Sequence, residues 1–65
     1  MNVELGQQVK IVDSAHPQVV LFTAHVSWVY KNGGFIAQYG ANEIWFSRSG
    51  IHFNGQKILY AYPMN

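Results

Sequence analysis

The sequence contains no cysteine, which excludes disulfides and thiolate metal sites and suits a reducing compartment. It also has little charge, since charged residues make up 11% of its 65 positions, against roughly 25% in ordinary globular proteins. No apolar run approaches the roughly 20 residues of a membrane helix, and the first residues lack the basic and apolar regions of a signal peptide. We therefore expect one small cytoplasmic domain over residues 1–65, with no membrane contact.

Basic residues number only four, and the net charge is +1, which is little for a protein that must neutralise a phosphate backbone. Aromatic residues, in contrast, reach 15%. A chain of this length buries only about 60% of the surface that its unfolded form exposes, so some aromatic side chains must lie on the surface. Exposed aromatics among few charges are typical of the centres of protein interfaces.

Residues 19–31 alternate between apolar and polar side chains, which is the period of a β-strand and not of a helix. A strand of this length is expected to bend or to carry a bulge. Residues 7–13 are predicted to form an earlier strand, and residues 14–18 a loop around Pro17. The positions of the long strand that we expect to face inward are Val20, Phe22, Ala24, Val26, Trp28 and Tyr30.

Four turn signals follow, at Asn32-Gly33, at residues 40–43, at Ser49-Gly50 and at Asn54-Gly55. A two-residue loop at Asn32-Gly33 would pair Tyr30 with Phe35, whereas a three-residue loop would move every later side chain to the opposite face. With two-residue loops at Asn32-Gly33, Ser49-Gly50 and Asn54-Gly55 and a four-residue connection at residues 40–43, the successive turns agree on one inner face. They predict an all-β fold of five to six antiparallel strands in a meander, curled into a small barrel. The later inward positions are Phe35, Ala37, Tyr39, Ile44, Phe46, Ile51, Phe53, Ile58, Tyr60 and Tyr62.

The opening run Leu5-Gly6-Gln7-Gln8-Val9-Lys10-Ile11-Val12-Asp13, followed by a loop and three hairpins, resembles the layout of SH3-like small barrels. Similar openings occur in Tudor-like and KOW-like modules and in the plasmid-borne type II dihydrofolate reductases. Those reductases carry a Val-Gln-Ile-Tyr segment in a tetrameric pore, and residues 43–46 of this chain, Glu-Ile-Trp-Phe, do not reproduce it. The resemblance implies a small barrel, and it does not justify assigning the reductase activity to this chain. An enzyme of that pore-forming kind is a third hypothesis, which would require oligomerisation to build a site.

No residues form a catalytic or metal-binding pattern. The carboxylates Glu4, Asp13 and Glu43 are predicted at a terminus and in turns, so they do not converge on one bond. Asp13, Ser14, Ala15 and His16 contain the residue types of a nucleophilic triad, but they are four successive residues at the end of the first strand and in the following loop. Turn hydrogen bonding is the better explanation for them. The three histidines match no metal-ligand spacing, and we expect no enzyme activity, cofactor or metal.

Trp45 is the main candidate for a binding residue, because its neighbours are predicted to point inward and period two then turns Trp45 outward. The leading hypothesis is a protein-binding module that self-associates or acts as a small adaptor or inhibitor of a larger protein; an origin in a phage or mobile element is a further guess. The alternative function is the binding of single-stranded nucleic acid by the barrel. For Trp45 itself, the alternative to partner contact is that the loop at residues 16–18 or a terminus covers its ring. The residues assigned to protein binding are Trp45, Gln38, Val29, Ile36, His25 and Ser47, and those assigned to nucleic acid are Trp45, Lys31, Lys57 and His52.

Overall fold

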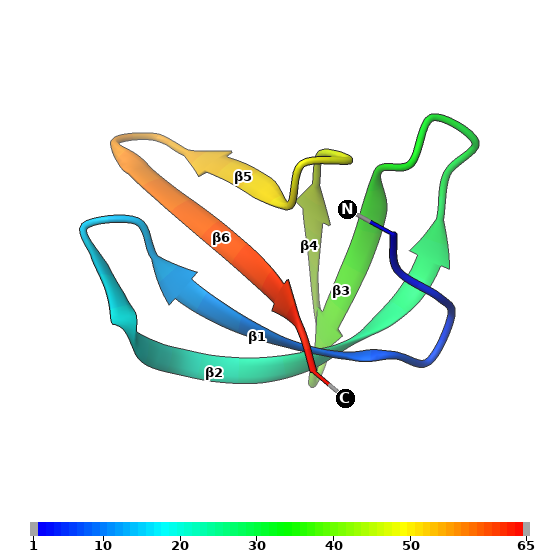
Figure 1. Cartoon of the computed structure of the whole chain (residues 1–65), viewed down its shortest axis with the longest axis horizontal. Coiled ribbons are helices and arrows are strands. Elements are labelled where there is room, and N and C mark those ends of the chain that lie inside the picture. Colours follow the sequence, from blue (N-terminus) through cyan, green and yellow to red (C-terminus); the bar gives the residue numbers. More distant parts are fainter. Residues whose placement is uncertain (1, 65) are drawn as a thin grey trace.

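The computed structural model describes residues 2–64, which form six β-strands and no helix (Figure 1). Every strand pair is antiparallel, and the strands make one sheet in the order β4-β3-β2-β1-β6-β5. The sheet curls into a small, nearly closed barrel, which confirms the predicted all-β class. The strands are β1 (Gln8–Asp13), β2 (His16–Val29), β3 (Phe35–Tyr39), β4 (Asn42–Phe46), β5 (Ile51–Asn54) and β6 (Lys57–Pro63).

The strands β1 to β4 follow one another as a meander, and the β5–β6 hairpin returns so that β6 pairs with β1. This connectivity leaves β4 and β5 at the two ends of the sheet. Curling brings these ends together at the turn between them, where the Ser47 N–H donates to the Ile51 carbonyl over 2.9 Å. We call the junction between β4 and β5 the seam of the barrel.

The core lies inside the barrel, and no polar or charged residue among residues 2–64 is buried. Phe35 and Phe46 stack at its centre, with ring centroids 5.3 Å apart. The smaller residues of the core let the strands approach one another closely across this narrow interior. The buried cluster consists of Val9, Ile11, Ala24, Val26, Phe35, Ala37, Phe46 and Ala61.

The β2–β3 turn differs from the predicted two-residue loop. The Tyr30 N–H donates to the Gly34 carbonyl, and the Gly33 N–H donates to the Tyr30 carbonyl, which makes a three-residue loop. Gly33 has φ +94°, a left-handed conformation that glycine adopts without steric cost and that completes this type of loop. The loop moves the register by one residue, so Trp28 pairs with Ile36 instead of Ala37.

The inward positions predicted for Trp28 and Tyr30 are therefore wrong. Ser27 is an additional residue in β2 between the pairs Val26–Ala37 and Trp28–Ile36, and this bulge reverses the alternation of side chains. Because the bulge and the three-residue loop each reverse the alternation once, Val26, Phe35 and Ala37 still face inward as predicted. A further irregularity opposite Ile11 and Val12 pairs Val20 with Val12 and leaves Val20 47% exposed, contrary to prediction.

The β3–β4 turn preserves the predicted faces. Tyr39 pairs with Asn42 across the two-residue loop Gly40-Ala41, so the register moves by two residues from the prediction and the alternation is unchanged. Phe46 accordingly faces the core, and Trp45 faces outward and is 56% exposed. The outward orientation of Trp45 is confirmed, although Tyr39, which was predicted inward, is largely exposed.

The turn between β4 and β5 is another three-residue loop, in which Gly50, with φ +79°, donates its N–H to the Ser47 carbonyl. Here no bulge restores the alternation, so the predicted faces of β5 and β6 are reversed. Leu59 and Ala61 pack against the core, whereas Phe53 is 71% exposed. The other positions wrongly predicted as inward are Ile51, Ile58, Tyr60 and Tyr62, of which Ile51, Ile58 and Tyr60 are half-buried outside the core cluster.

The two remaining turns also differ from prediction in their bounds. The loop after β1 consists of Ser14 and Ala15 alone, because Asp13 pairs with His16 and Pro17 already belongs to β2. The Asp13 carboxylate accepts a hydrogen bond from the Ala15 N–H over 2.9 Å, which is the turn chemistry expected for this segment. At the last hairpin Asn54 pairs with Lys57, so the loop is Gly55-Gln56 rather than Asn54-Gly55.

Candidate protein-binding surface

Four apolar or aromatic side chains share the outer face of β2, β3 and β4, and we call them the aromatic patch: Trp28, Tyr30, Ile36 and Trp45. The register places Ile36 between Trp28 on one side and Trp45 on the other. The two indoles are 54% and 56% exposed, whereas Ile36 is only 8% exposed. On the outside of a sheet such burial comes from the neighbouring side chains, so the two tryptophans shield Ile36 from water.

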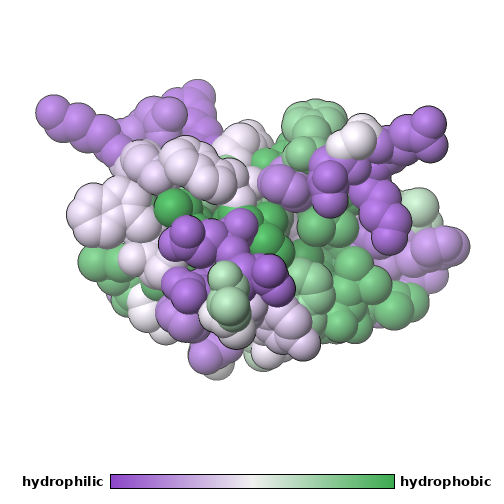
Figure 2. All heavy atoms as spheres, turned by 180° about the vertical axis from the view of Figure 1, so that it is seen from behind, coloured by the Kyte–Doolittle hydropathy of each residue, from purple (hydrophilic) through white to green (hydrophobic). Residues whose placement is uncertain are grey.

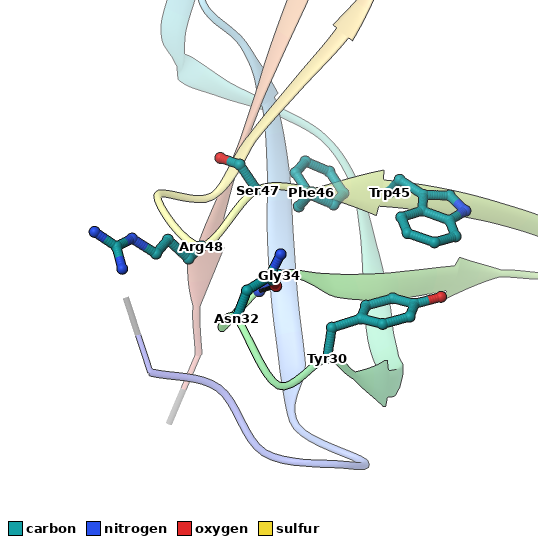
Figure 3. Close-up of a pocket in the computed structure, with 7 residues that line it drawn as sticks. All are labelled: Tyr30, Asn32, Gly34, Trp45, Phe46, Ser47 and Arg48. Carbon is teal, nitrogen blue, oxygen red and sulfur yellow. Dashed lines mark hydrogen bonds between the residues drawn. The ribbon is translucent and has the colours of Figure 1, made fainter.

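Tyr30 extends the patch from the end of the β2–β3 hairpin. Its ring stacks on Trp45 with centroids 4.6 Å apart and an interplanar angle of 20° (Figure 3). The residue paired with Tyr30 is Gly34, which has no side chain to occupy the space above the sheet. A Cβ at Gly34 would lie 3.1 Å from both the Asn32 Oδ1 and the Phe46 carbonyl oxygen. A side chain at position 34 would therefore crowd the Asn32 side chain and the Phe46 backbone, which explains a glycine opposite Tyr30.

A shallow hollow of about 560 Å³ adjoins the stacked pair (Figure 3). Its polar wall is fixed by turn hydrogen bonds: the Asn32 Oδ1 accepts from the Gly34 N–H over 2.9 Å, and the Ser47 Oγ accepts from the Ser49 and Ile51 N–H groups over 3.3 Å. The Arg48 side chain extends away from the two rings. The hollow is lined by Tyr30, Asn32, Gly34, Trp45, Phe46, Ser47 and Arg48.

Most of the residues predicted to bind protein lie on or beside the patch. Trp45 and Ile36 belong to it, and His25 and Gln38 pair with each other in the adjacent row of the same strands. The Gln38 Nε2 donates to the Gly40 carbonyl over 3.2 Å, which directs that side chain toward its own turn. Val29 does not belong to this surface, because the bulge at Ser27 turns it inward, where it packs against the core.

The residues predicted for nucleic-acid binding are not brought together. Lys31 follows Tyr30 in the β2–β3 turn, whereas Lys57 pairs with Asn54 in the β5–β6 hairpin, which β1 separates from β2 in the sheet. His52 lies at the seam: its Nδ1 is 2.7 Å from the Trp45 carbonyl oxygen, and its ring is 5.7 Å from that of Phe46. His52 was predicted outward beside Ser47, and this prediction is wrong because the Gly50 loop reverses β5.

Trp28 and Tyr30 are the members of the patch that sequence reasoning missed. The glycines at 33 and 34 were compatible with a three-residue loop, which would have turned Tyr30 outward. The bulge at Ser27 has no comparable signal, because serine is an ordinary outward residue in a strand.

Within residues 2–64, no group of three or more histidine, aspartate or glutamate side chains lies close enough to hold a metal ion. The same part of the chain contains no helix that is long and apolar enough to cross a membrane. Comparisons with known protein families, with curated proteins and with solved structures gave no match. The role of the aromatic patch is therefore inferred from its own geometry.

Proposed function

We propose that this chain is a non-enzymatic protein-binding module that contacts another protein through the aromatic patch. The observation that supports the proposal is that Trp28 and Trp45, the only two tryptophans of the chain, stand half-exposed on either side of Ile36. Tryptophan and tyrosine are the residues most enriched at binding hot spots, because their large rings are desolvated at little conformational cost. The patch supplies three such rings on one rigid sheet.

The surroundings of the patch fit a protein partner. Polar groups border it at Gln38, His25, Asn32 and Ser47, as at the rim of an interface with an apolar centre. We further propose that the barrel belongs to the SH3-like small barrels, in which aromatic-lined grooves bind extended peptide segments. An apolar side chain of such a segment would fill the hollow beside Tyr30 and Trp45.

The proposal is tested by capturing partners from the source cell with the wild-type protein and with the double variant Trp28→Ala/Trp45→Ala. A matched control is Phe53→Ala, which removes an aromatic ring that is 71% exposed on β5, outside the patch. We expect a captured protein to be retained by the wild type and the control and lost with the double variant. A partner that binds all three equally would contradict the proposal.

Binding of single-stranded nucleic acid is the second candidate, because Lys31 and Arg48 lie in the turns beside the stacked rings of Tyr30 and Trp45. Both tryptophans belong to the patch, so quenching of tryptophan fluorescence reports on this surface alone. Two cations predict a shallow dependence of affinity on salt, with a slope of about −1.4 in log–log form. Quenching by single-stranded DNA with this slope, abolished in Trp45→Ala, would favour nucleic acid over a protein partner.

A further inference from the structure

Two of the four basic residues of the chain lie beside the aromatic patch, although they come from separate turns. Lys31 belongs to the β2–β3 turn, next to Tyr30, and Arg48 belongs to the turn between β4 and β5. A Cβ at Gly33 would lie 2.9 Å from the Cβ of Arg48, so the backbone of the first turn lies directly against the stem of Arg48. The glycine therefore brings the two turns, each with one cation, together at one end of the patch.

Lys31 and Arg48 line a second hollow, of about 450 Å³, which adjoins the hollow beside the stacked rings because Asn32 and Arg48 line both. Hydrophilic side chains gather at the upper left of Figure 2, where the β2–β3 turn lies. Among residues 2–64, no aspartate or glutamate lines either hollow. Two cations with amide and hydroxyl donors suit a single anionic group. The second hollow is lined by Asn2, Lys31, Asn32, Gly33, Arg48 and Ser49.

The outer face carries the opposite charge on the other side of Trp45. Glu43 precedes Trp45 by two residues on β4, so both side chains face outward, and Glu43 pairs with Gln38 in the next row. A polyanion laid along the patch would meet Glu43, whereas a peptide with one acidic side chain at the turn end would not. Nucleic acid also needs a track of cations rather than a single cluster. The charges therefore favour an acidic peptide.

We propose that the segment bound at the aromatic patch carries an aspartate or glutamate whose carboxylate binds Lys31 and Arg48, two positions from the apolar side chain beside Trp45. This inference rests on the proposed function and names the chemistry of its partner. Side chains two residues apart in an extended segment point to the same side and lie about 7 Å apart, which suits two adjoining hollows. Because Glu43 repels an acidic residue at the far end, the segment binds in one direction.

A phage-displayed library of random peptides of about eight residues, selected on the intact wild-type protein, tests the proposal. We expect the selected peptides to share an apolar residue with an acidic residue two positions away, always on the same side. Lys31→Glu/Arg48→Glu reverses the charge of the second hollow and should select a basic residue at that position instead. The matched control is Lys10→Glu/Lys57→Glu, which changes the net charge equally at two exposed lysines outside both hollows and should select as the wild type does.

The affinity of one selected acidic peptide, measured by fluorescence anisotropy, gives the size of the effect. Lys31→Glu/Arg48→Glu should raise the dissociation constant of this peptide at least about tenfold, because two attractions become repulsions. Replacing the acidic residue of the peptide by lysine should restore binding to this variant. Such a restoration also shows that the variant is folded.

The outcomes separate this inference from the proposed function. Peptides that require the two tryptophans but show no acidic preference, or the same preference with Lys31→Glu/Arg48→Glu, would overturn this inference alone. A library from which no peptide is enriched would also overturn it, while partner capture with Trp28→Ala/Trp45→Ala still decides the proposed function. Selected peptides that this tryptophan variant still binds would contradict both. Binding of oligothymidylate through Lys31 and Arg48, with no acidic peptide selected, would assign the cations to phosphate and overturn the inference.

Discussion

Trp45 and Phe35 are both aromatic residues of the β2–β3–β4 part of the barrel, and they differ in how much solvent each contacts. Phe35 is fully buried and stacks on Phe46, whereas Trp45 is 56% exposed and contacts Tyr30 across its outer face. Removing a side chain from the core leaves a cavity as well as losing its transfer free energy. Removing the half-exposed ring of Trp45 loses its contact with Tyr30 and uncovers part of Ile36, but it leaves no cavity in the core.

We therefore predict that Trp45→Ala lowers the free energy of unfolding by about 1 kcal/mol, whereas Phe35→Ala lowers it by about 3–5 kcal/mol. Urea denaturation followed by circular dichroism measures both values. The comparison separates binding from folding, because a variant at position 45 that loses its partner while remaining folded has lost a contact surface. An equal loss of stability for the two variants would mean that Trp45 supports the fold.

Among the elements, the two three-residue turns decide which side chains face the core. At each turn a glycine occupies the third loop position with positive φ, Gly33 at +94° and Gly50 at +79°. The hairpin signals in the sequence located the turns, but loops of two and three residues both accept Asn, Gly and Ser. Loop length thus depends on how the flanking strands twist and pack, which local sequence does not specify.

Because loop length sets which side chains of the next strand face the core, the inward positions were predictable for some strands and not for others. A strand over residues 7–13 was predicted without an assignment of its faces. The strands β3 and β4 lie where the bulge at Ser27 offsets the longer turn, so their main inward positions were predicted. β5 and β6 follow a turn that nothing offsets, so their faces were reversed. For the candidate site, this means that Trp45 and Ile36 could be predicted from the sequence, whereas Trp28 and Tyr30 required the structure.

Two turn glycines, Gly33 and Gly55, differ in how much space surrounds them. Gly33 and Gly55 both have positive φ, so alanine at either position is strained by about 1–2 kcal/mol. At Gly33 the added Cβ would also lie 2.9 Å from the Cβ of Arg48, whereas at Gly55 it would meet nothing within 4 Å. Gly33→Ala should therefore destabilise the protein more than Gly55→Ala, as measured by thermal unfolding. Equal effects would show that the β2–β3 turn moves away from Arg48 at little cost.

For the whole molecule, the weakest line of the barrel is the seam between β4 and β5. The strands β1 and β2 occupy the middle of the sheet, whereas β4 and β5 are joined by the Ser47–Ile51 hydrogen bond and by His52. His52 lies across the seam, with its Nδ1 2.7 Å from the Trp45 carbonyl oxygen. Local opening of a protein begins where few bonds hold an element, so opening of this barrel should begin at the seam.

We predict that His52→Ala speeds amide hydrogen exchange at Ser47, whose N–H donates to Ile51 across the seam. The Val26 N–H donates to the Gln7 carbonyl over 2.8 Å beside β1, so its exchange should follow global unfolding. In His52→Ala its exchange should change only as far as the variant lowers the free energy of unfolding, by about 1 kcal/mol. His25→Ala is the matched control, because His25 is exposed and should leave both amides unaffected. If the two amides accelerate by the same factor in His52→Ala, the barrel opens as one unit and His52 contributes only to overall stability. A selective change at Ser47 would instead show that a single histidine holds the two ends of the sheet together, next to the tryptophan on which the proposed binding depends.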